Sequence, residues 1–134
     1  MVSSIPIKKR CGGAIMLLHA GESLQEQIAE WGCLHPTVRI QLALSAVPTT
    51  VRTLMSDVVS IVIDATEHPD AATQTLESVL AIIQSVETEL KLGVYTEKVH
   101  EGLELFVRRR GILFLLGPMV MAEWDGFFEG VVIE

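Results

Sequence analysis

The sequence has few of the features by which many proteins reveal their function. Among its 134 residues there are only two cysteines, Cys11 and Cys33, and they do not form a CxxC pair. This pattern predicts no disulfide framework and is typical of reduced thiols in a cytoplasmic protein. The sequence also lacks GxGxxG, Walker, HExxH and GxSxG motifs, so nothing predicts a dinucleotide, nucleotide, zinc or hydrolase site. We therefore expect no cofactor and no bound metal.

Long hydrophobic runs and an excess of positive charge are missing as well. No apolar stretch approaches the length needed to cross a bilayer. Lys8, Lys9 and Arg10 precede an apolar run as in a signal peptide, but that run, residues 14–18, is too short for one. The net charge is −7 and the pI is about 5.0, which argues against nucleic acid as a partner because an acidic domain repels phosphate backbones. We expect neither a membrane nor a nucleic-acid partner.

Apolar residues are abundant, and they predict a folded protein. Hydrophobic residues make up 49% of the sequence and charged residues 20%, which argues against disorder. The length suits one domain, residues 1–134, with residues 1–12 as a loose arm or an edge strand. No linker, repeat or low-complexity segment divides the chain.

Five short apolar runs predict β-strands. They are residues 14–18, 38–44, 58–63, 92–95 and 112–116. Four of them are nearly continuous in Val, Ile, Leu, Met or Phe, which is typical of parallel strands covered on both faces.

Helical patterns separate and follow these runs. Ser23 and Glu26 have the spacing of a capping box, which predicts that a helix begins at Ser23. A short helix is predicted from Pro48 and a longer amphipathic one from Pro69 to Val86. Two more are predicted over residues 99–109 and 119–132. Strands that alternate with helices form right-handed βαβ units, so we predict a three-layer α/β sandwich with a five-stranded parallel sheet.

Reactive groups of such sheets gather where the strands end. His19 and Ala20 follow the first run, Asp64 the third, Thr96 the fourth, and Gly117-Pro118 the fifth. Each also has a structural interpretation. Asp64 and Thr96 are common as turn or cap residues, and Gly-Pro commonly ends a strand.

This order of residues, with its intervals, resembles the receiver domain of response regulators. The resemblance covers residues 14–134 and implies a flavodoxin-like sheet of strand order 2-1-3-4-5. It places Asp64 at the phosphate-accepting position, Thr96 at the hydroxyl position and Pro118 at the proline position. The family's acidic pair, which holds a divalent cation, is His19 and Ala20 here, and its lysine is Gly117. Without cation and lysine the developing charge has no partner. We therefore expect a pseudo-receiver, a non-enzymatic module for signal transduction or scaffolding that binds other proteins.

A second resemblance offers an alternative function. His19 directly after a first parallel strand resembles the phosphohistidine site of mannose-type phosphotransferase IIA domains, and imidazole is a competent phosphoryl carrier. The family's Gly-Gly-Ser-Pro segment is absent, however, because TEHPD stands in its place.

The C-terminal third of the chain predicts a partner surface. In receivers the fourth helix, fifth strand and fifth helix form the common contact surface. One helix cannot bury all the apolar residues of segment 119–132 against one sheet, because a core-facing stripe covers only part of its circumference. We therefore expect a symmetric homodimer or another protein partner at this surface, through Phe106, Phe114, Met121, Trp124, Phe128 and Val132.

Overall fold

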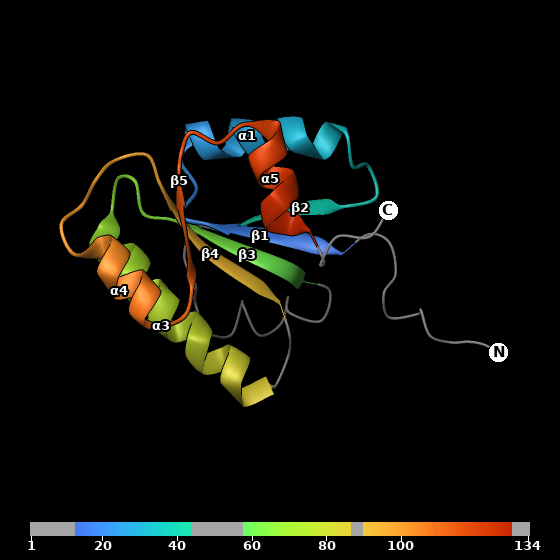
Figure 1. The fold of residues 1–134 in the computed structure, drawn as a ribbon. Coiled ribbons are helices and arrows are strands. Elements are labelled where there is room, and N and C mark those ends of the chain that lie inside the picture. Colours follow the sequence, from blue (N-terminus) through green and yellow to red (C-terminus); the bar gives the residue numbers. More distant parts are fainter. Residues whose placement is uncertain (1–12, 44–57, 87–89, 130–134) are drawn as a thin grey trace.

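A computed structural model of the chain describes residues 13–43, 58–86 and 90–129, and it contains the predicted parallel sheet (Figure 1). Five strands, all pairing in parallel, lie in the order β2-β1-β3-β4-β5. They are β1 Ala14–Leu18, β2 Arg39–Ala43, β3 Val58–Asp64, β4 Lys91–Thr96 and β5 Leu113–Leu116. The described helices are α1 Glu22–Cys33, α3 Pro69–Val86, α4 Leu103–Arg109 and α5 Met121–Phe128. The predicted architecture and strand order are confirmed.

Helices cover the sheet on both faces (Figure 1). On one face α1 and α5 pack over a core that contains Ile15, Leu17 and Val62 from the sheet. On the other face α3 and α4 pack over Met16, Ile61 and neighbouring side chains. All five residues of β1 are buried, because alternate side chains enter the two cores. This double burial explains why the strand runs are continuously apolar.

The predicted bounds of three helices are wrong: α1 begins at Glu22 and not at Ser23, α4 begins at Leu103 and not at residue 99, and α5 spans Met121–Phe128 and not residues 119–132. Helix α1 begins at Glu22 after Gly21, and no side chain caps it. The predicted capping box is therefore wrong: the Ser23 hydroxyl donates instead to Glu97, which follows β4. The helix predicted from Pro48 lies outside the described residues.

No helix in the described ranges is long and apolar enough to span a bilayer.

Candidate functional site

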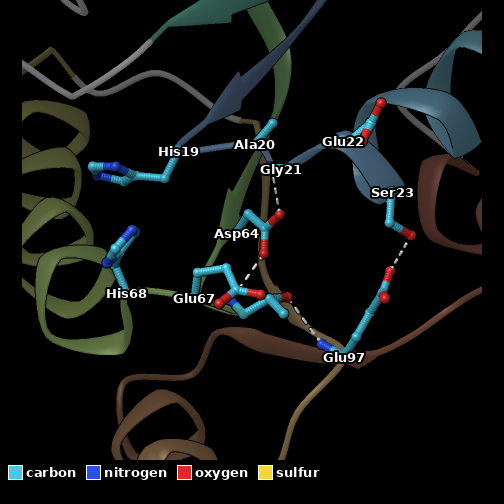
Figure 2. A pocket seen from close by; sticks show the side chains of 10 residues that line it. His19, Ala20, Gly21, Glu22, Ser23, Asp64, Glu67, His68 and Glu97 are labelled. Carbon is cyan, nitrogen blue, oxygen red and sulfur yellow. Dashed lines mark hydrogen bonds between the residues drawn. The ribbon is translucent and has the colours of Figure 1, made fainter.

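A pocket of about 430 Å³ opens where β1, β3 and β4 end (Figure 2). Its lining comes from the three connections that follow these strands and from the start of α1. The lining residues are His19, Ala20, Gly21, Glu22, Ser23, Asp64, Thr66, Glu67, His68 and Glu97. The sequence correctly predicted that His19 and Asp64 lie at one edge of the sheet. None of these described lining residues is a lysine or an arginine.

Asp64 is held at the base of the pocket by backbone donors. Its side chain is only 5% exposed. The Gly21 amide donates to Oδ2 at 2.9 Å, and the Thr66 amide donates to Oδ1 at 2.9 Å. Asp64 therefore ties the β1–α1 connection to the β3–α3 connection, which agrees with the structural interpretation of this residue.

His19 turns away from α1 and toward α3. Its backbone is left-handed, with φ +58°, and its Nε2 is hydrogen-bonded to Thr75 Oγ1 at 2.7 Å. Partial burial and the charge of nearby His68 lower the pKa of His19, while Asp64 opposes this shift. Figure 2 shows the two histidine side chains on the same side of the pocket. The lowered pKa favours the neutral form of His19, and one of its ring nitrogens is already engaged by Thr75.

The structure does not bring Thr96 and Pro118 into this pocket. Thr96 is fully buried, and its hydroxyl donates to the Lys98 carbonyl at 2.8 Å and accepts from the Lys98 amide at 3.1 Å. Thr96 is therefore a turn residue, as its structural interpretation predicted. Pro118 follows a cis peptide bond with Gly117 and is exposed.

The position of the receiver lysine is closed by Tyr95. A Cβ atom added at Gly117 would overlap the ring and hydroxyl of Tyr95, which is itself fully buried. The Tyr95 hydroxyl donates to Glu97 Oε2 and accepts from Gln27 Nε2 at 2.7 Å. Burial, and then the bond to Glu97, raise the pKa of Tyr95, so its hydroxyl stays protonated. A side chain longer than hydrogen does not fit at position 117 unless Tyr95 moves.

Glu97 lies at the pocket rim as an anionic acceptor. Hydrogen bonds from Ser23 and Tyr95 lower the pKa of Glu97. Its backbone amide donates to Thr66 Oγ1 at 3.0 Å, and His100 Nε2 is hydrogen-bonded to the Thr66 carbonyl at 2.9 Å. The β3–α3 and β4–α4 connections are thus bonded to each other.

The pocket residues do not fit the divalent cation of receivers. Mg²⁺ requires several oxygen ligands in near-octahedral geometry. Here Ala20 offers no side-chain donor, His19 Nε2 is bonded to Thr75, and both carboxylate oxygens of Asp64 accept backbone N–H groups. Glu67 is paired with Lys98 at 3.0 Å, and Figure 2 shows Glu22 directed away from Asp64. Across the described residues, no three His, Cys, Asp or Glu side chains gather in a way that could hold a metal ion.

A second concave region lies on the predicted partner surface. It has a volume of about 560 Å³ and is formed by α4, β5 and the β4–α4 connection. Phe114 lines this region. Two other residues predicted for partner binding, Phe106 and Met121, are half-buried and pack against the two cores of the sheet. The exposed apolar residues of this region were not predicted. We define the contact surface as Val99, Leu105 and Leu116, which line this region and are between 55% and 91% exposed.

Two residues predicted for partner binding are core residues instead. Trp124 and Phe128 are each 1% exposed. They stack on each other with ring centroids 5.7 Å apart, and Phe128 also packs against Trp31 of α1. The prediction that Trp124 and Phe128 bind a partner is therefore wrong, because α1 covers that side of α5. Val132 lies outside the described residues.

Sequence reasoning missed the polar cluster of Gln27, Tyr95 and Glu97. The only signal was indirect: Gly117 occupies the position of a lysine, and a tyrosine ends the preceding strand. Nothing in the sequence indicates that the Tyr95 side chain fills the space beside Gly117.

Among the comparisons with known proteins, the one with solved structures identifies the fold. The sequence matches no protein-family model and no curated protein. Solved structures match over nearly the whole chain. A response regulator receiver protein from Pseudoalteromonas atlantica is 15% identical with a TM-score of 0.68, covering 88% of this chain and 95% of its own. A two-component response regulator from Legionella pneumophila is 15% identical with a TM-score of 0.68, covering 87% and 95%.

A third solved structure, the non-phosphorylated HemR receiver domain from Leptospira biflexa, is similar to the same degree. It is 19% identical with a TM-score of 0.61, covering 89% of this chain and 93% of its own. At such identities the likeness concerns the fold and not the activity. The chain has the fold of a response-regulator receiver domain.

Proposed function

We propose that this chain is a cytoplasmic, non-enzymatic pseudo-receiver, a signalling or scaffold module that acts by binding another protein or a second copy of itself. The observation that carries the proposal is the overlap between Tyr95 and any side chain at position 117. A receiver lysine at that position contacts the transferred phosphoryl group, so its loss removes the charge that would stabilise the group. Two further features support the proposal. Ala20 has no side chain that could bind a cation, and both carboxylate oxygens of Asp64 accept backbone N–H groups.

The alternative of a His19 phosphocarrier is not favoured. The solved structures that match this fold include response-regulator receivers. In addition, Thr75 engages Nε2 of His19.

The contact surface supports protein binding. Exposed apolar patches with a polar rim are typical of protein–protein interfaces. Beside the exposed Leu105, Glu104 and Arg108 form an ion pair of 2.7 Å one helical turn apart on α4. Such a surface carries both charge signs around an apolar centre, so two copies related by a twofold axis could pair Glu104 of each with Arg108 of the other. We therefore propose a symmetric homodimer through the contact surface.

Leu116→Glu tests this proposal. The substitution puts a charge into the contact surface and should shift the particle to monomer mass in light scattering. Leu34→Glu is the matched control, because Leu34 is similarly exposed but lies at the end of α1, and it should leave the mass unchanged. Circular dichroism checks that both variants fold. A wild-type protein that is monomeric at high micromolar concentration would refute the homodimer, as would a Leu116→Glu variant that remains dimeric.

A further inference from the structure

Gln27 of α1 lies between three parts of the molecule that are far apart in sequence. Its Nε2 donates to the Tyr95 hydroxyl at 2.7 Å and lies 3.1 Å from Glu97 Oε2. Its Oε1 accepts from the Met119 amide at 2.9 Å and from Trp124 Nε1 at 3.3 Å. One amide side chain therefore bonds the end of β4, the β5–α5 connection and α5 to α1.

The Met119 bond is important because of its location. Met119 belongs to the segment 117–120, which joins β5 to α5 and directly follows Leu116 of the contact surface. The Gly117 amide at its start donates to the Thr96 carbonyl at 2.9 Å, and the Val120 amide at its end donates to Glu123 at 2.9 Å. Between these two ends, Gln27 provides the hydrogen bond that fixes the segment to α1.

This bond is partly buried and lies beside two buried aromatic side chains. Tyr95 and Trp124 are almost completely buried, and their rings stack with centroids 5.8 Å apart. A hydrogen-bonded network in such low-dielectric surroundings is rigid when its members are satisfied. The Tyr95 hydroxyl, Ser23 hydroxyl and Glu97 carboxylate each have a partner within the cluster.

We infer that Gln27 is a positioning residue that holds segment 117–120 in one conformation, so that the contact surface stays formed without a phosphoryl trigger. The part of this inference that concerns binding rests on the proposed function. In physical terms, the intramolecular network replaces an external ligand as the group that orders this edge of the sheet. A surface that is already ordered loses less conformational entropy when its partner binds.

Amide hydrogen exchange tests the inference without any partner. Gln27→Met keeps the length and packing of the side chain but removes its donors and acceptor. We expect exchange of the Gly117, Met119 and Val120 amides to accelerate by about tenfold, while amides of β1 and β3 keep their rates. Gln25→Met is the matched control, because Gln25 lies on the exposed side of the same helix and donates to the Ala20 carbonyl. It should leave segment 117–120 unchanged.

The outcomes separate this inference from the proposed function. Acceleration at Met119 alone, with Gly117 and Val120 unchanged, would overturn the inference, because the segment would then be held without Gln27. If Gln27→Met does not fold, Tyr95→Phe removes the same cluster's hydroxyl and should give a smaller acceleration at the same amides; no change there would also overturn it. An unchanged dimer mass in Leu116→Glu, by contrast, would refute the homodimer and leave the exchange result standing.

Discussion

Position 117 requires glycine because the side chain of Tyr95 fills the adjacent space, and not because of the backbone conformation of Gly117. The glycines with positive φ in the described residues are Gly102 and Gly111, whereas at Gly117 the constraint is the buried ring of Tyr95. The pair explains in steric terms why the receiver's lysine position cannot be occupied here. It also shows why the sequence revealed only half of the site: the missing lysine is visible in the sequence, but the residue that fills its space is not.

Gly117→Ala should therefore be destabilising. Adding a methyl group against the Tyr95 ring overpacks a filled site, and we expect a loss of about 1–3 kcal/mol in the free energy of unfolding. Gly126→Ala is the control, because nothing lies within 4 Å of a Cβ at this position of α5. It should be neutral or stabilising by about 0.5–1 kcal/mol, since alanine favours helix more than glycine does. Urea denaturation of both variants measures the difference, and equal stabilities would contradict the steric account.

Burial should lower the pKa of His19 in the folded protein. Its pKa in the folded protein is below the ordinary value of 6.5, through burial and then His68. Between the folded and unfolded pKa values the unfolded chain binds more protons, so the contribution of neutral His19 to stability is lost as pH falls through 6.5 toward the folded pKa. His68→Asn should raise the pKa of His19 by removing a nearby positive charge. An NMR titration of the ring protons measures both values, and a His19 pKa that does not respond to His68→Asn would contradict the assignment.

The strands and helices were predictable to different degrees. The apolar runs identified all five strands, and β1 has the predicted bounds. The continuous runs of β1 and β3 follow from burial on both faces of the sheet. Pro69 and the apolar spacing that follows it correctly predicted α3. The start of α1 was not predictable, because Ser23 has the spacing of a cap residue but is used as a donor to Glu97, which is distant in sequence.

Helix α5 shows the limit of an argument from one helix alone. Placed at 100° per residue, Val120, Trp124, Phe127 and Val131 were predicted to form one core-facing stripe. Trp124 and Phe127 are buried, but Val120 is 64% exposed, and Val131 lies outside the described residues. Phe128 was assigned outside the stripe because only the sheet was considered as a packing partner. The side of α5 that faces α1 is buried too, as the contact between Phe128 and Trp31 shows.

Phe128→Ala should consequently act on stability and not on association. Removing a fully buried aromatic ring should cost about 3–5 kcal/mol in the free energy of unfolding. Leu116→Ala, at an exposed position of β5, should change stability by less than about 0.5 kcal/mol. Chemical denaturation measures both. Similar losses for the two variants would contradict the division between core and contact surface.

At the scale of the whole molecule, the chain has the fold of a receiver, and hydrogen bonds within the chain connect the loops at the edge where β1, β3 and β4 end. Asp64 remains at the end of β3, but its oxygens link two loops. Tyr95 and Glu97 occupy the region of the missing lysine, and Gln27 connects them to α5 through Trp124. Hydrogen bonds within the chain thus join the β1, β3, β4 and β5 connections that a cation and a phosphoryl group would otherwise bridge.

The central claim is that this edge does not accept a phosphoryl group. Incubation of the protein with acetyl phosphate and Mg²⁺, followed by intact mass measurement, tests it most directly. A phosphorylatable receiver treated in parallel serves as the positive control. We expect the mass of this protein to remain unchanged while the control gains one phosphoryl group. A stoichiometric, base-labile adduct that disappears in Asp64→Asn would contradict the claim, because it would show that Asp64 is still an acceptor.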